Sequence, residues 1–351
     1  MPTTTGPGDT APRATIADAL STGWSDSSAE AELHYVSGKG GTGKTTAAVS
    51  LALALASSGK SVLVVEVEER QGIARAFDRP PLPYREEPVA RVDGGGTVSA
   101  LAIDIEAAML DYLDTFYHLG VVGRAMRSVG AIEFATTIAP GLRDVLLTGK
   151  VYEVATREHA KREVVYDAVV VDAPPTGRIG KFLDVTTAMA DLASGGPIRR
   201  QAEAVAELVH SPRTVVHLVT MLESLPVQET LEAIEELGGH GLRVGQVMIN
   251  RAETRHLDDD ALERIAAEEI DAEAVLTGLR ETGYEPDDDE DLQGLLVEAI
   301  EHARVARGQL AAGDSLTEAG CPTVVLPALP DGVDVADLYD LASVLVDQGV
   351  R

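Results

Sequence analysis

The sequence predicts a doubly wound α/β fold, in which a mostly parallel sheet carries helices on both faces. Short, nearly unbroken runs of Val, Leu and Ile recur along the 351 residues, and segments with helical periodicity separate them. Such runs are typical of parallel strands that are buried on both faces. We expect strands at residues 33–36, 61–67, 98–103, 168–171, 214–219, 244–249 and 323–326.

Three longer segments break this alternation and have mostly helical patterns. They predict an inserted α-helical subdomain on top of the core, assembled from about 105–163, 186–211 and 257–312. Residues 32–351 are expected to form a single domain with this insertion. Residues 1–31 are rich in Thr, Ser, Gly, Ala and Pro, which predicts a disordered N-terminal tail.

A glycine-rich run follows the first predicted strand. Residues 38–46 read GKGGTGKTT and match the phosphate-binding pattern G-x-x-x-x-G-K-[ST]. Glycines allow the backbone to wrap around phosphate oxygens, and the amides at the start of the next helix donate to them. The run therefore predicts a P-loop NTPase. The residues expected to bind the nucleotide are Gly40, Gly41, Thr42, Gly43, Lys44, Thr45 and Thr46.

Within this loop, Lys44 is expected to reach the β- and γ-phosphates, and the Thr45 hydroxyl to bind Mg²⁺. A second lysine, Lys39, lies five residues earlier. It is not needed to hold one nucleotide, so we expect it to act on the γ-phosphate of a second subunit, as an arginine finger does. The alternative is a solvated surface lysine.

The run KGGTGKT resembles the deviant Walker A loop of dimeric ATPases. These include MinD, ParA, the nitrogenase iron protein, and the arsenite-pump ATPase (ArsA) with its tail-anchored-protein-targeting relatives. The similarity to the last group extends over most of residues 32–347 and is strongest for the actinobacterial ArsA-like branch, whose members often occur as paired paralogues. The resemblance implies ATP and Mg²⁺ as cofactors, and a homodimer or a heterodimer with a paralogous ATPase.

A second phosphate-facing segment begins at Asp172, where the strand of residues 168–171 ends. A carboxylate there is expected beside Mg²⁺, bound through a water. Residues 172–178 are similar to the family's D-x-A-P-T-G-H switch, with a second proline inserted and Arg178 where many members have His. Gly177 allows the flexing of a loop that senses the γ-phosphate. The alternative is that Asp172 only caps the next helix.

The segment after the second strand departs most from the family. There the family usually has an aspartate that orients the attacking water, followed by Pro-Ala-His, whereas this chain reads EVEERQG at residues 66–72. Glu68 falls at the aspartate's position, and we expect it to orient the water. Its extra methylene can cost rate, because a displacement of about 1 Å matters. The alternatives are Glu69, no carboxylate at all, or exposed loop charges.

The base pocket is predicted from the ends of two later strands. The Asn250 amide can donate to and accept from an adenine edge, and the family has an adenine-contacting Asn in its corresponding segment. The backbone around Pro327 resembles the loop that covers the ring. Residues 251–253 break the pattern of GTP-binding relatives, so ATP is favoured. The alternative for Asn250 is a strand-end turn residue.

Composition excludes several functions. There are 57 acidic and 29 basic residues, a net charge of −28, which repels nucleic acid and anionic lipid headgroups. The single cysteine, Cys321, excludes an internal disulfide and a Cys-x-x-Cys metal site. No apolar run reaches about 18 residues, so no integral membrane segment is expected. Residues 1–30 lack the features of a signal peptide, and we expect a cytoplasmic protein.

The predicted function is that of a dimeric, Mg²⁺-dependent ATPase in which nucleotide state controls a helical subdomain that binds a client or partner. A hydrophobic helical client is one candidate. The apolar cluster at residues 109–119 is then either core or client groove. The alternative function is a hydrolytically slow ATP-binding scaffold that holds a client or a paralogous subunit.

Overall fold

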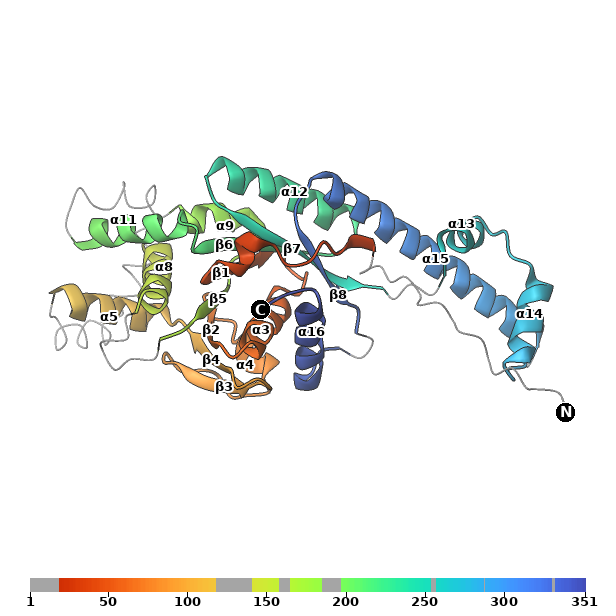
Figure 1. Cartoon of the computed structure of the whole chain (residues 1–351), viewed down its shortest axis with the longest axis horizontal. Helices are drawn as coiled ribbons and strands as arrows, with labels where there is room; N and C mark the ends of the chain where they lie inside the picture. Colours follow the sequence, from red (N-terminus) through yellow and green to blue (C-terminus); the bar gives the residue numbers. More distant parts are fainter. Residues whose placement is uncertain are drawn as a thin grey trace.

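The computed structural model describes residues 19–117, 141–157, 165–184, 197–253, 257–286, 288–329 and 332–351. Within them, one eight-stranded sheet has the order β3-β4-β2-β5-β1-β6-β7-β8, and only the β3–β4 pair is antiparallel. The α/β fold predicted from the sequence is confirmed (Figure 1). The strands are β1 (Leu33–Gly38), β2 (Ser61–Glu66), β3 (Glu87–Arg91), β4 (Thr97–Ala102), β5 (Ala168–Asp172), β6 (Thr214–Thr220), β7 (Val244–Ala252) and β8 (Thr323–Pro327).

The edge strand β3 was not predicted. Its sequence, EPVAR, has a proline and only one buried apolar residue, Val89. Proline removes a ladder donor and is tolerated at a sheet edge. A short edge strand of this kind lacks the apolar run by which the other strands were recognised.

Helices cover both faces of the sheet, as a doubly wound fold requires. The face built by Leu63 and Val65 packs against α5, α8, α9, α11 and α12, and the face built by Val62 and Val64 packs against α3, α4 and α16. The bounds are α2 (Asp26–Ala29), α3 (Lys44–Ser57), α4 (Gly72–Ala76), α5 (Ile105–Tyr117), α8 (Leu142–Ala155), α9 (Thr176–Leu183), α11 (Pro197–Val209), α12 (Ser224–Gly239), α13 (Asp259–Ala266), α14 (Ala272–Glu281), α15 (Asp289–Glu318) and α16 (Val335–Asp347).

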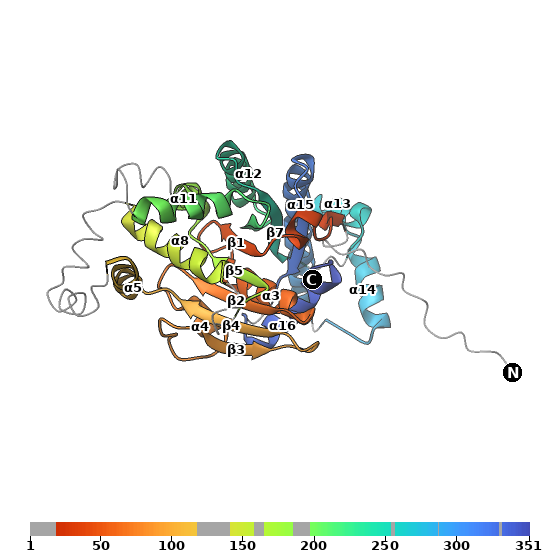
Figure 2. The ribbon, with the colours of Figure 1, turned by 60° about the vertical axis from the view of Figure 1, so that its left-hand side comes forward.

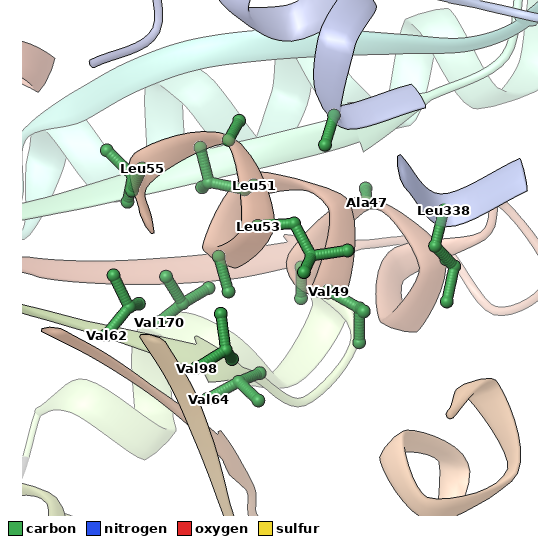
Figure 3. Packing of buried hydrophobic residues seen from close by; sticks show 14 of the residues in the cluster. Ala47, Val49, Leu51, Leu53, Leu55, Val62, Val64, Val98, Val170 and Leu338 are labelled. Carbon is green, nitrogen blue, oxygen red and sulfur yellow. The ribbon is translucent and has the colours of Figure 1, made fainter. Parts of the chain in front are cut away.

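Helix α3 is the most deeply buried of these helices. Every residue from Ala47 to Ala56 is buried, so this helix is apolar on all sides. In Figure 3 its side chains lie against strand residues that include Val62 and Val170, and Leu338 of α16 approaches from the other side. The burial fixes the helix, and with it the loop that precedes its first turn.

The helical insertions form two groups rather than the single subdomain that we predicted. Helices α5, α8 and α11 gather at one end of the molecule, whereas α13, α14 and the outer part of α15 lie at the opposite end (Figures 1 and 2). The strand order explains the separation. The first group leaves the sheet between β4 and β6, and the second connects β7 to the edge strand β8.

The prediction of a disordered tail up to residue 31 is wrong for residues 19–31, the part that the structure describes. Leu20 packs into the cluster beneath β7 and β8, and its carbonyl accepts a hydrogen bond from the Thr323 hydroxyl. The Trp24 amide donates to the Gln348 carbonyl at 2.9 Å. The segment therefore adds apolar cover to the sheet despite its polar composition.

Trp24 also covers a buried histidine pair. The Trp24 and His217 rings stack with centroids 5.1 Å apart. The backbone amide of Gln246 donates to His217 Nδ1. His217 therefore carries its proton on Nε2 and donates it to His34 Nδ1 at 3.0 Å. His34 Nε2 then donates to the Ala31 carbonyl. Both rings are satisfied only in the neutral form, and burial lowers the pKa of His34 to about 4 and lowers that of His217.

This pair should make stability fall with acid. A histidine whose folded-state pKa is below its ordinary value of 6.5 contributes stability above pH 6.5, and that stability is lost as pH falls toward 4. For His34 the loss is about 2 kcal/mol in unfolding free energy between pH 7.5 and pH 5. Urea unfolding at both pH values checks it. The loss of unfolding free energy between the two pH values should be about 2 kcal/mol smaller in His34→Gln than in wild type, and unchanged in the control His240→Gln at an exposed position. Equal losses in wild type and His34→Gln would contradict the pKa assigned to His34.

Candidate functional site

The glycine-rich loop lies between the end of β1 and the start of α3, at the carboxyl edge of the sheet. Gly41 and Gly43 have φ values of +92° and +87°, which side chains rarely adopt. A β-carbon on Gly43 would lie 2.2 Å from Asn250 Nδ2. Glycine is therefore required there by both conformation and space. The loop amides and the positive end of α3 form a site suited to phosphate.

Lys44 and Thr45, in the first turn of α3, bring the predicted site together. The Thr45 hydroxyl donates to Asp172 Oδ2 at 2.6 Å. Lys44 is only 8% exposed. Burial lowers its pKa, and the nearby carboxylates of Asp172 and Glu68 oppose that shift. A hydroxyl, a carboxylate and an ammonium group thus converge where the loop would hold phosphates.

The Asp172 carboxylate is itself buried. Burial raises its pKa to about 6, and the neighbouring carboxylates of Glu66 and Glu68 add to the rise, while Thr45 and Lys44 oppose it. Because burial disfavours the ionised carboxylate, a bound cation explains its position better than the capping of a helix does. The donor set of the Thr45 hydroxyl and one carboxylate fits Mg²⁺, which keeps several waters and takes few protein ligands. Among the described residues, no group of three or more His, Cys, Asp or Glu side chains could hold a metal by itself.

The two glutamates that follow β2, Glu68 and Glu69, have separate environments. Glu69 accepts from the Ile105 amide at 3.2 Å and pairs with Arg143, so it faces α5 and α8. Glu68 is 17% exposed and lies 3.7 Å from Arg70. Glu68 also lines a cavity of about 340 Å³ with Pro174 and Phe182. Of the two residues considered for water orientation, Glu68 is therefore the one beside the second segment.

The second segment, residues 172–178, connects β5 to α9. The Ser37 hydroxyl at the end of β1 donates to the Pro174 carbonyl at 2.7 Å and fixes this connection beside the loop. Gly177 lies in the first turn of α9, and a β-carbon there would meet nothing within 4 Å. Arg178 is 57% exposed and pairs with Asp144 of α8 at 3.7 Å.

Lys39 has a partner within its own chain. Its Nζ lies 2.7 Å from Glu229 Oε1 of α12, and the two side chains are 36% and 32% exposed. In this structure the lysine is therefore neither free in solvent nor directed at its own loop. No local pattern pointed to Glu229, because 190 residues separate the two partners.

Asn250 is 5% exposed and lies behind the loop. Its Nδ2 donates to the Thr42 carbonyl at 2.8 Å, so the amide donor that was predicted for adenine here braces the loop. Pro327 ends β8 and pairs in register with Ala252, close along the chain from Asn250. Residues 330 and 331, which follow Pro327 by three and four positions, lie outside the described residues.

Fold and site together define a P-loop nucleotide-binding protein of the α/β class. The model of the anion-transporting ATPase (ArsA ATPase) family matches residues 32–195. ATPase BagA of Mycobacterium tuberculosis is 55% identical over 331 residues, which are 94% of this chain and 97% of that protein. The chain therefore belongs to the anion-transporting ATPase family, as its loop motif suggested.

Two more distant relatives extend the same comparison. ATPase GET3 of Kluyveromyces lactis is 24% identical over 251 residues, 62% of this chain and 71% of that protein. The ATPase ASNA1 homolog of Entamoeba histolytica is 24% identical over 256 residues, 62% of this chain and 75% of that protein. No helix in the described part of the chain is long and apolar enough to cross a membrane.

Proposed function

We propose that this chain is a Mg²⁺-dependent ATPase that works as a dimeric switch, with nucleotide state controlling its helical layer. The observation that carries the proposal is the Thr45–Asp172 hydrogen bond of 2.6 Å beside the buried Lys44. Mg²⁺ would be held by the Thr45 hydroxyl and, through water, by Asp172, and would supply charge to the phosphates. Names of the relatives support ATP as the nucleotide.

The chain's own residues have distinct roles in this proposal. Lys44 and the loop amides hold the phosphates, and Glu68 orients the attacking water within the cavity that it lines with Pro174. Asn250 keeps the loop closed by donating to the Thr42 carbonyl, its Oδ1 would accept from the adenine, and the backbone at Pro327 would cover the ring. These assignments predict a lower rate of hydrolysis than an aspartate at this position would give, since Glu68 is one methylene longer.

Coupling to the helical layer is supported by ion pairs that join both switch segments to α8. Arg143 pairs with Glu69 of the first segment at 3.2 Å, and Asp144 pairs with Arg178 of the second at 3.7 Å. Glu69 and Gln71 also have left-handed backbone conformations, with φ of 56° and 55°. Such strain often marks a segment with two stable arrangements. A nucleotide that moves either segment would therefore move α8.

In this proposal, Lys39 acts on the γ-phosphate bound by the partner subunit. An ion pair whose side chains are about one-third exposed is worth less than about 1 kcal/mol, so a γ-phosphate across a dimer could displace Glu229 at little cost. Met109 and Tyr112 of α5 are buried in the core, which supports a core role for this part of the 109–119 cluster. Residues 118 and 119 of that cluster lie outside the described residues.

Releasing Lys39 should favour the dimer. We expect Glu229→Gln to lower the protein concentration at which ATP and Mg²⁺ drive dimerisation, by about 5-fold or less, because only a surface pair is lost.

Replacing Lys39 by alanine should lower the rate of hydrolysis by about 10²-fold and leave nucleotide affinity unchanged, as for loss of one donor to a transition state. Native mass and phosphate release measure the two effects.

The control for this pair is Glu235→Gln, since Glu235 is exposed on the same helix. It should behave as wild type. If Lys39→Ala changed neither dimerisation nor hydrolysis, the proposed action of Lys39 on the partner subunit's nucleotide would be contradicted.

The second candidate is a hydrolytically slow ATP-binding scaffold that holds a client or a paralogous subunit. It is favoured by the Glu68 side chain, which is engaged with Arg70 in this structure. Single-turnover hydrolysis with and without a co-expressed paralogue separates the two functions. Absence of phosphate release in both conditions would leave the scaffold as the function.

A further inference from the structure

One carboxylate beside the site is not used by the proposed function. Glu66 is the last residue of β2 and is 2% exposed. It pairs in register with Asp172 on the adjacent strand. Val64 and Val170, two residues earlier on each strand, both face the side of α3, so the alternation of strands turns Glu66 and Asp172 toward the first turn of α3.

Only half of the Glu66 carboxylate has a partner. Its Oε2 accepts from the Ile73 amide at 3.0 Å. Its Oε1 is buried, and no donor in the described part of the chain reaches it. A buried carboxylate oxygen without a donor or cation costs free energy, so it calls for a ligand that donates hydrogen bonds.

The space at Gly72 locates this carboxylate relative to Thr45. A β-carbon on Gly72 would lie 3.1 Å from Thr45 Cγ2, 3.3 Å from Thr45 Oγ1 and 3.7 Å from Glu66 Oε2. The Thr45 hydroxyl and the Glu66 carboxylate therefore border the same small space. Glycine leaves that space without a side chain.

Capping of α4 explains only part of this arrangement. The Ile73 amide lies in the first turn of α4, and Oε2 alone satisfies it. A neutral acceptor would do the same without a buried charge beside Asp172. The remaining oxygen and the negative charge both point to a cation.

We propose that Glu66 is a second carboxylate of the Mg²⁺ site, accepting through Oε1 a hydrogen bond from a water bound to the ion. The inference rests on the proposed function, because the ion enters with the nucleotide. Mg²⁺ keeps several of its waters in proteins, and carboxylates that orient such ligands affect metal affinity about 10- to 100-fold. Glu66 and Asp172 would then hold the hydrated ion from two adjacent strands.

The test is Mn²⁺ binding to the protein–ADP complex of the full chain, measured by electron paramagnetic resonance of free Mn²⁺. Glu66→Gln retains an oxygen for the Ile73 amide but removes the charge and one acceptor. We expect its Mn²⁺ affinity to fall about 10-fold. Binding of a fluorescent ADP analogue in EDTA should stay within about 2-fold of wild type, because the loop is intact.

Glu87→Gln on β3 is the matched control, with one glutamate charge removed from a strand away from the loop, and should bind Mn²⁺ as wild type does. Unchanged Mn²⁺ affinity in Glu66→Gln would overturn the inference. So would an equal loss of metal-free ADP binding, which would indicate that Glu66 only supports the loop. A wild-type chain that binds no ADP, with or without Mn²⁺, would contradict the proposed function itself.

Discussion

Replacing Lys44 by alanine is expected to lower the rate of ATP hydrolysis at least about 10³-fold and to weaken nucleotide binding. Lys44 is 8% exposed and lies at the start of α3, where the loop would hold the β- and γ-phosphates. Its removal takes away the only buried ammonium group of the described site. Phosphate release and titration with a fluorescent ATP analogue measure the two effects.

The fold should survive this change, because α3 is anchored by the apolar residues from Ala47 to Ala56. Circular dichroism and the unfolding midpoint check that point. Lys181→Ala provides the control, since Lys181 is exposed on α9. Hydrolysis by Lys44→Ala within about 10-fold of wild type would contradict the assignment of the loop.

Replacing Asp172 by asparagine is expected to weaken Mg²⁺ binding about 10- to 100-fold and to raise stability without ligands. The neutral amide retains an oxygen for the Thr45 hydroxyl but removes a buried charge. The pKa of Asp172 is raised in the folded state from 3.8 to about 6. The ionised form therefore disfavours folding, by about 3 kcal/mol when pH is well above 6.

The sign of the pH dependence follows from that shift. The contribution of Asp172 to wild-type stability should rise as pH falls through 6, opposite in sign to that of His34, because Asp172 takes up a proton in the folded state first. The advantage of Asp172→Asn should be largest at pH 7.5 and shrink toward pH 4. Urea unfolding of the metal-free protein, with the exposed Asp93→Asn as control, measures it. A variant less stable than wild type at pH 7.5 would contradict the assigned cost.

Local patterns in the chain predicted the sheet well. Seven strands, each four to seven residues long, were expected from runs of Val, Leu and Ile, because burial on both faces demands such residues. The edge strand β3 was missed because burial on one side allows the sequence EPVAR. The tail was misjudged because residues 19–31 gain their order from contacts with Thr323 and Gln348, which lie about 300 residues away.

The site was predictable where chemistry is local. The loop motif indicated Lys44 and Thr45, and the strand end indicated Asp172, which the Thr45 hydroxyl contacts. Glu66 was missed, although strand alternation puts it on the same face as Asp172. The Glu229 partner of Lys39 left no local signal.

The sequence by itself determined the family, the α/β layer and the phosphate loop, because each depends on residues that are close along the chain. Only the tertiary structure decided how the charged side chains are used. It paired Lys39 with Glu229, braced the loop with Asn250, and placed a second buried carboxylate, Glu66, beside Asp172. These arrangements depend on the order of strands and on burial, since the partners are distant in sequence and the energy of a charge depends on its surroundings.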